Sequence, residues 1–328
     1  MKEEVTPEKI HQNFLKGDLN KEDASDLLIS LVNESEDAII RRKSIDLLEK
    51  IDFQDDTIFK ILENHLISDE NANVRASAAR VIILNFLDEG LEPIEWSTKN
   101  DKSPIVIKTI IDTFERRKES NHEAIESNLH IFMENLALNL GVVYEEARFF
   151  LDLEAIFSIN KVNYKVNPFD YKNFEVLFNC KDSEPWLVIK NKHVEILDLN
   201  FFNWGFIKEN GEIFDSFSRL KNLEFYLNTI RKYSKFNFES TTVPESIGKL
   251  TSLKKLKLAR NNLEIIPDSI RNLTCLSKLD LSHNCFQEIP PILKSLNSLE
   301  ILNMKYNNIQ TISHSMKNFV NSLVEFKF

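Results

Sequence analysis

The chain has 328 residues, 42% of them hydrophobic and 28% charged, a composition that fits two or three globular domains and argues against a disordered protein. Residues 1–160 hold 18 Lys and Arg against 33 Asp and Glu, a net charge of −15, whereas residues 161–328 hold 23 against 18, a net charge of +5. This asymmetry favours two domains and makes nucleic acid an unlikely partner of the acidic half, because binding to phosphates requires Lys and Arg.

The N-terminus and the cysteines indicate where the protein works. The first residues, Met1 to Glu4, are charged and contain no apolar core, so we expect no secretory signal. No apolar run reaches the roughly 18 residues that a membrane-spanning helix needs, so no membrane insertion is expected. Three cysteines, Cys180, Cys275 and Cys285, are too few for a disulfide framework. They predict reduced thiols and a cytoplasmic location.

Residues 1–141 are predicted to form a helical repeat domain, because apolar residues recur there at intervals of three and four. An apolar residue followed by a cation opens three helical segments, spaced by 34 and 33 residues: Ile40-Arg41, Val74-Arg75 and Ile107-Lys108. Each segment follows a short acidic or polar loop, and the small residues Ser44 and Ala78 would permit close helix approach. The pattern resembles HEAT-type helical repeats. A non-repetitive helical bundle is the alternative.

Two further features of this half concern helix ends and metal binding. Three glycines are expected to end helices: Gly17, Gly90 and Gly141. Four potential ligands recur every fourth residue along one helix: His122, Glu126, His130 and Glu134. Two neighbours could share a zinc ion, but four along a straight helix cannot converge on one ion. We therefore interpret them as a solvated face and predict no metal site.

Residues 142–172 are predicted to be a helical connector, with one more helix from Tyr144 to Phe157. Short apolar strands follow. Phe174–Phe178 and Trp186–Ile189 are predicted to form a hairpin, over 173–193, that caps the end of a stack of repeats. Two long irregular repeats are predicted over 194–249, opening at Val194 and Leu223.

Three regular units of 23 residues occupy 250–318, and each repeats the frame Leu-x-x-Leu-x-Leu/Met-x-x-Asn-x-apolar. The asparagine position of this frame is occupied by Asn261, Asn284 and Asn307. Self-similarity at a fixed period is the signature of a stacked-repeat solenoid. A terminal strand is predicted over 319–328, and its exposed edge, which natural proteins usually protect, leaves dimerisation at Phe326–Phe328 open.

The unit that begins at Leu250 resembles the 23-residue leucine-rich repeat of the Ras-suppressor and plant-disease-resistance type. The resemblance covers 243–319 well and 186–242 less regularly, so 173–328 is identified as a leucine-rich repeat domain. It implies a two-domain solenoid, in which an all-α HEAT-like superhelix precedes an α/β leucine-rich-repeat horseshoe with a parallel concave sheet. It also implies a non-catalytic adaptor or scaffold for intracellular signal transduction that binds a protein partner, with a small GTPase among the candidates by analogy.

The concave face is the predicted binding site, because alternate residues of the strands point away from the buried leucines. Five cations form a basic patch there, and Ile196, Phe201 and Phe225 form an apolar patch beside it, which is a typical interface mixture. The residues predicted to contact the partner are Ile196, Asp198, Phe201, Phe225, Lys255, Lys257, Arg260, Lys278, Asp280, His283, Asn303, Lys305 and Tyr306. The alternative is that the lysines only solvate an open face and Phe225 packs under a loop.

Catalysis is not expected. The chain has no Gly-rich phosphate loop, no Gly-x-Ser-x-Gly, no His-Glu-x-x-His and no paired-cysteine zinc pattern, so we predict no catalytic residue, metal or cofactor. Cys285 and His283 lack the preorganised cleft that a Cys/His nucleophile needs. The asparagines Asn261, Asn284 and Asn307 are predicted to bond the backbone at the turns as a structural ladder. The alternative function is binding of nucleic acid or another acidic polymer through the Lys255–Lys305 patch.

Overall fold

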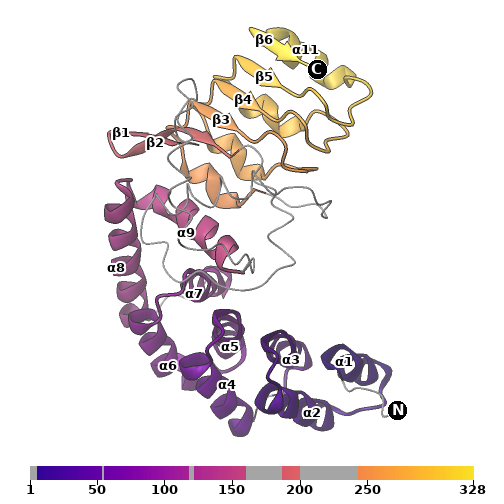
Figure 1. The fold of residues 1–328 in the computed structure, drawn as a ribbon, viewed down its shortest axis with the longest axis vertical. Helices are drawn as coiled ribbons and strands as arrows, with labels where there is room; N and C mark the ends of the chain where they lie inside the picture. The colour runs from indigo at the N-terminus through magenta and orange to yellow at the C-terminus, as the bar shows by residue number, and fades with distance from the viewer. Residues whose placement is uncertain (1–5, 54, 118–121, 160–186, 200–242) are drawn as a thin grey trace, which may run out of the picture. The chain divides into compact units, whose positions relative to one another are not determined.

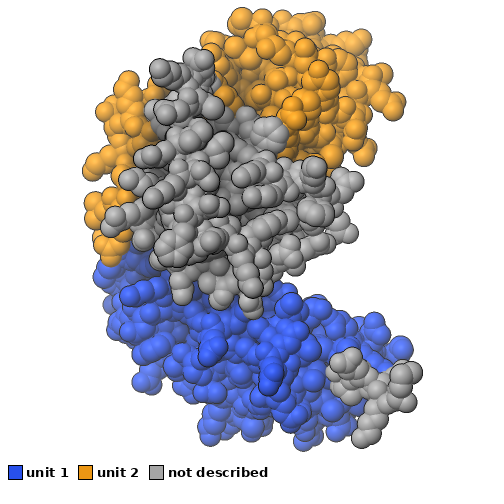
Figure 2. Space-filling model, in the orientation of Figure 1, with its two compact units in different colours: residues 1–132 blue, residues 133–328 orange. Residues whose placement is uncertain are grey.

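The computed structural model describes residues 6–53, 55–117, 122–159, 187–199 and 243–328 (Figure 1). By their contacts the residues divide into two compact units, 1–132 and 133–328 (Figure 2). Within the described residues, the N-terminal part is helical and the C-terminal part contains a sheet. The domain limits proposed at 141 and 172 stay predictions.

α-Helices form the N-terminal part of the chain. They are α1 (Pro7–Lys16), α2 (Lys21–Glu34), α3 (Ala38–Ile51), α4 (Asp56–Ser68), α5 (Ala72–Asn85), α6 (Leu87–Asn100), α7 (Pro104–Arg117), α8 (Glu123–Leu140) and α9 (Tyr144–Ile159). The first N–H groups of a helix have no partner within it, so polar side chains accept from them. Asn20 does this at α2, Asp37 at α3 and Asn71 at α5.

Helices of the first unit pack in two rows. One row contains α3, α5 and α7, and the other contains α2, α4 and α6, with α2 against α3 and α4 against α5. The facing residues are apolar, and Ile45, Val74 and Ile107 are fully buried. Ser44 and Ala78, which were expected to permit close helix approach, are also fully buried.

Two arginines connect successive helix pairs in the same way. Arg41 of α3 donates to the Asp69 carboxylate in the turn before α5, and Arg75 of α5 donates to the Asp101 carboxylate in the turn before α7. Each arginine also donates to two backbone carbonyls of the turn that precedes its own helix. The same contacts therefore recur 34 residues apart.

Gly90 corrects one expectation from the sequence. Gly17 and Gly141 follow α1 and α8 with φ of 81° and 73°, as expected of glycines that end helices. Gly90 instead lies inside α6, so the prediction that a helix ends there was wrong. A Cβ at this position would overlap Cγ2 of Ile82 on α5, so the absence of a side chain permits α5 and α6 to approach closely.

The second unit contains one six-stranded sheet. Its strands, in spatial order, are β1 (Leu187–Lys190), β2 (His193–Asp198), β3 (Lys255–Lys257), β4 (Lys278–Asp280), β5 (Ile301–Asn303) and β6 (Glu325–Lys327). β1 is antiparallel to β2, and the other neighbours are parallel (Figure 1). The connections between parallel strands contain η3 (Glu245–Lys249), η4 (Asp268–Asn272), η5 (Pro291–Ser295) and α11 (His314–Ser322).

The buried layer of the sheet comes from the repeated leucines. Leu256, Leu279 and Leu302 lie at the centres of β3, β4 and β5, and each is at most 1% exposed. A buried carboxylate joins α9 to the same layer: Glu146 accepts a hydrogen bond of 2.9 Å from the Val194 N–H and lies 3.0 Å from Nδ1 of His193. The start of β2 is thereby fixed to α9.

The pairing of β2 with β3 corrects the predicted order of strands. A repeat opening at Leu223 was expected to supply a strand between them, with Phe225 between Ile196 and Lys255. In the sheet, Ile196 pairs directly with Lys255, so that arrangement was wrong. Phe225 itself, like the predicted strand Phe174–Phe178, lies outside the described residues.

Candidate interaction surface

The sheet has one face that is not covered by its buried leucines, which we term the open face. Two rows of residues cross it from β2 to β6, since parallel strands bring equivalent positions side by side. The first row is Ile196, Lys255, Lys278, Ile301 and Glu325, and the second is Asp198, Lys257, Asp280, Asn303 and Lys327. The predicted residues of the strands therefore share this face, and cations dominate it on β3 and β4.

Two polar residues of the open face turn back to their own backbone. The Asp280 carboxylate accepts a hydrogen bond of 3.0 Å from the Ser282 N–H, and Oδ1 of Asn303 accepts one of 3.2 Å from the Lys305 N–H. These two side chains shape the ends of their strands. Lys278 on β4 and Lys305 after β5 are exposed to solvent.

The third residue after each of β3, β4 and β5 has an unusual backbone conformation. Arg260, His283 and Tyr306 follow β3, β4 and β5 with φ of 61°, 55° and 59°. Positive φ is uncommon for residues other than glycine, and here it recurs at the same place in three repeats. The rings of His283 and Tyr306 stack with centroids 4.2 Å apart, and Tyr306 is 72% exposed. The sequence predicted these positions but gave no sign of their backbone conformation.

The asparagines bind the repeats together beneath this row. The Asn284 side chain donates to the Leu258 carbonyl of the preceding repeat at 2.9 Å and accepts from the N–H groups of Asn261 and Leu263, both at 3.0 Å. Asn307 makes the corresponding bonds one repeat later, to the Leu281 carbonyl and the Phe286 N–H. Asn261 donates to the Leu199 carbonyl at 2.9 Å, so the set of bonds reaches the residue that follows β2.

The predicted apolar patch is described in part only. Ile196 lies in the first row of the open face and is partly exposed. Phe201 and Phe225 lie outside the described residues, and Asp198 is described by its strand pairing with Lys257 but not by its side chain. The part of the site that the structure describes is therefore mainly the cationic part.

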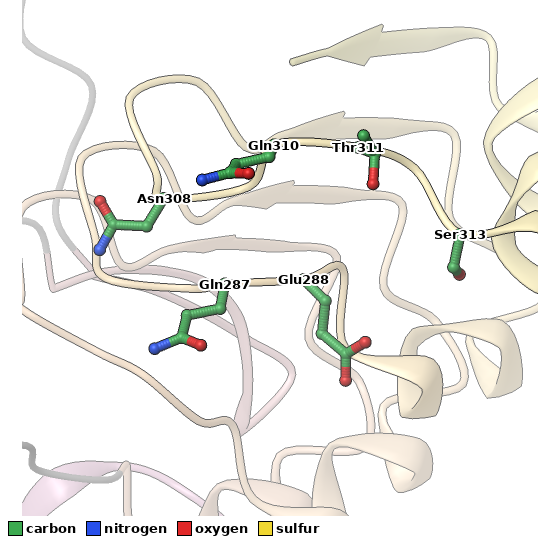
Figure 3. Close-up of a pocket in the computed structure, with 6 residues that line it drawn as sticks. All are labelled: Gln287, Glu288, Asn308, Gln310, Thr311 and Ser313. Carbon is green, nitrogen blue, oxygen red and sulfur yellow. The ribbon is translucent and has the colours of Figure 1, made fainter.

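A shallow polar hollow lies away from the strands, beside the segments that follow β4 and β5 (Figure 3). It has a volume of about 490 Å³ and is lined by Gln287, Glu288, Asn308, Gln310, Thr311 and Ser313. Sequence reasoning missed it, although the period of 23 residues already placed Gln310 beside Gln287 and Thr311 beside Glu288.

The described residues offer little for catalysis or metal binding. Among them, no three His, Cys, Asp or Glu side chains are grouped so as to hold a metal ion. Burial, and to a smaller extent Glu264, raises the pKa of the Cys285 thiol, which disfavours the reactive thiolate. Within the same parts of the chain, no helix has both the length and the apolar character needed to cross a membrane.

Comparison with known proteins identifies the repeats. Residues 236–286 match the leucine rich repeat family. No curated protein matches the chain. Among solved structures, a leucine-rich-repeat protein of Leptospira interrogans is 30% identical over 27% of this chain and 22% of that chain, with a TM-score of 0.23. The matching part thus spans about a fifth of that protein. A leucine-rich repeat region indicates a protein-interaction role and a non-enzymatic module.

Proposed function

We propose that this chain is a non-catalytic scaffold whose open face binds a protein partner through an acidic surface of that partner. One observation supports this proposal most. Lys255 and Lys278 are direct neighbours on β3 and β4, in register. Like charges placed opposite each other on adjacent strands destabilise a sheet. Both side chains lie on the open face, and two neighbouring positive charges suit a ligand of opposite charge.

The row beyond the strands supports the same proposal. Arg260, His283 and Tyr306 follow β3, β4 and β5, and the ring of the exposed Tyr306 stacks on that of His283, which follows the cation-bearing strand β4. Tyrosine and arginine are the residues most often found at the energetic centre of protein interfaces. An aromatic contact next to cations suits a protein surface that carries both acidic and apolar groups.

We also propose the repeat class to which each part of the chain belongs. We assign the helices of the first unit to the HEAT-like class and the units over 250–318 to the 23-residue class of leucine-rich repeats. The equivalent contacts of Arg41 and Arg75 support the first assignment, and the equivalent bonds of Asn284 and Asn307 support the second. By analogy with that class, we place the scaffold in cytoplasmic signalling, with a small GTPase as the first partner to test.

The proposal is tested by affinity capture with the whole chain as bait. The variant Lys255→Glu/Lys278→Glu changes the open face, and Lys249→Glu/Lys294→Glu, on η3 and η5, makes the same change of charge elsewhere. Both variants must unfold at the wild-type temperature or above it. A protein retained by the wild type and the control but lost by the open-face variant identifies the partner, whose affinity is then measured with purified components.

The same experiment separates the alternatives. If the open-face variant retains the same proteins as the wild type, the open face is not the binding site. If capture disappears after nuclease treatment and falls steeply with salt, the ligand is nucleic acid, because such binding depends on counterion release. Within the described rows, Asp280 and Glu325 interrupt the cations, which favours a protein over a polyanion.

A further inference from the structure

β6 is the last strand of the sheet, and one of its edges has no neighbouring strand among the residues that the structure describes. β6 pairs on one side with β5: the Glu325 N–H donates to the Glu300 carbonyl at 3.0 Å, and the Lys327 carbonyl accepts from the Met304 N–H at 2.7 Å (Figure 1). Backbone groups alternate in direction along a strand, so the N–H and C=O of Phe326 point to the opposite edge. Val324 and Phe328 flank β6, and we extend the same alternation to them.

We propose that this edge pairs with β6 of a second copy of the chain, antiparallel and about a two-fold axis at Phe326. In this arrangement Phe326 exchanges two hydrogen bonds with Phe326 of the second copy. Val324 lies opposite Phe328 of the second copy and forms a further hydrogen-bonded pair with it. By the two-fold symmetry, Phe328 forms the equivalent pair with Val324 of the second copy. The outward backbone groups of these three residues all gain partners in this way.

The charges of β6 are complementary under this symmetry. Glu325 and Lys327 lie on the same face of the strand, 45% and 44% exposed, and their charged atoms are 2.9 Å apart. Antiparallel pairing centred on Phe326 puts each Glu325 opposite Lys327 of the second copy, in the non-hydrogen-bonded position where side chains are closest. Charged residues normally protect an edge, because the charges that meet there repel. Here opposite charges meet.

The apolar residues around β6 support the same partner. Val324 is 81% and Phe328 is 51% exposed, and Phe328 stacks on Phe326 with ring centroids 6.0 Å apart. Two-fold pairing brings Val324 of one copy beside Phe328 of the other. Apolar surface that a single chain leaves open is thus covered where the new hydrogen bonds form.

The pairing is tested in the whole chain by exchanging the charges of Glu325 and Lys327. Sedimentation over a dilution series measures the dissociation constant of the dimer. The wild type is expected to dimerise. Glu325→Lys alone and Lys327→Glu alone place like charges opposite each other twice per dimer, and each is expected to raise the dissociation constant roughly tenfold or more. The double variant Glu325→Lys/Lys327→Glu is expected to restore it. An equimolar mixture of the two single variants is expected to form a mixed dimer, since all its pairs are again opposite in charge.

A backbone variant gives an independent test. Val324→Pro removes one outward N–H that pairing requires, and the fold should accept it: Val324 is mostly exposed, and Leu323 already has the extended conformation, φ −75° and ψ 145°, that precedes proline. Val324→Ala is the matched control, because it trims the same side chain and keeps the N–H. We expect a monomer from the proline variant and a dimer from the alanine variant.

Clear outcomes would overturn the proposal. A wild type that stays monomeric over the whole series would do so, as would a dimer with an affinity that neither single charge variant lowers. A dimer that Val324→Pro leaves intact, in a variant that unfolds at the wild-type temperature, would exclude pairing through this edge.

Discussion

Arg41 donates two hydrogen bonds of 2.9 Å to the carboxylate of Asp69, which lies 28 residues further along the chain. The Asp69 side chain is only 3% exposed, and it also lies 2.9 Å from Nδ1 of His65. A planar guanidinium suits this geometry, because its two nitrogens match the two oxygens of a carboxylate. The pair therefore holds the α4–α5 turn against α3.

Removing Arg41 should destabilise the first unit. Arg41→Ala leaves the Asp69 carboxylate buried with only His65 and backbone groups, and we expect the free energy of unfolding to fall by about 3 kcal/mol. Urea denaturation followed by circular dichroism measures the loss. Lys43→Ala is the control, since its ion pair with Glu8 is exposed and should contribute less than about 1 kcal/mol. Equal losses in the two variants would contradict the argument.

Asp69 should also make the free energy of unfolding depend on pH in the acidic range. Burial alone would raise its pKa, but hydrogen bonds from His65, Arg41 and the Asn71 N–H together lower it. A lowered folded-state pKa gives stability that is fully present above the unfolded value, about 4, and lost as the pH falls through the folded value. The difference in unfolding free energy between the wild type and Asp69→Asn should therefore narrow below about pH 4. A difference that stays constant in strong acid would refute this.

Asn284 should be structural rather than a ligand contact. Asn284→Ala leaves the N–H groups of Asn261 and Leu263 and the carbonyl of Leu258 buried without their partner, so we expect a loss of about 2–4 kcal/mol. Asn297→Ala, at an exposed position between η5 and β5, should cost little. Thermal unfolding compares the two variants. Lost partner binding with an unchanged melting temperature would instead show that Asn284 contacts the ligand.

Gly90 should tolerate no side chain. Gly90→Ala gains about 1 kcal/mol of helix propensity, but the new methyl group overlaps Ile82, and overpacking costs about 1–3 kcal/mol. We expect a net loss of stability. In an Ile82→Ala background the overlap is gone, so the same change at Gly90 should become neutral or stabilising. A loss of the same size in both backgrounds would show that Ile82 is not the cause.

One substitution on the open face, Lys278→Glu, should weaken partner binding and at the same time raise the free energy of unfolding. Lys278→Glu places opposite charges on Lys255 and its neighbour, so we expect the free energy of unfolding to rise by about 0.2–1 kcal/mol. The captured partner should bind more weakly. Urea denaturation and a binding titration on one protein sample measure both effects. A fall in stability would mean that the two lysines do not repel each other in the folded chain.

The period of the sequence predicted the sheet where the repeats are regular. Leucines spaced 23 residues apart indicated strands at Lys255–Lys257, Lys278–Asp280 and Ile301–Asn303, and the structure has strands there. The neighbour of β2 was not predictable in this way, because strand pairing over a long separation depends on packing that no local pattern records. The expectation of a further strand between Ile196 and Lys255 was wrong for this reason, and the position of Phe225 stays a prediction.

The sequence did not predict the role of Gly90 or the backbone conformation of the residues that follow the strands. Gly90 could end a helix or permit close packing, and only the position of Ile82 distinguishes the two. Arg260, His283 and Tyr306 have positive φ, which is uncommon for Arg and Tyr, so no sign of this shared conformation was present in the sequence. Hydrogen bonds between neighbouring repeats accompany this conformation: the Arg260 N–H donates to the Ser282 carbonyl and the His283 N–H to the Lys305 carbonyl.

The side chains of Asn284 and Asn307 each bond to their own repeat and to the one before it. These bonds join neighbouring repeats, so they do not depend on how many repeats stand on either side. Duplication or loss of a whole 23-residue unit in a gene would recreate the same interface at the junction. The width of the open face can therefore change in evolution by whole strands, without a new core.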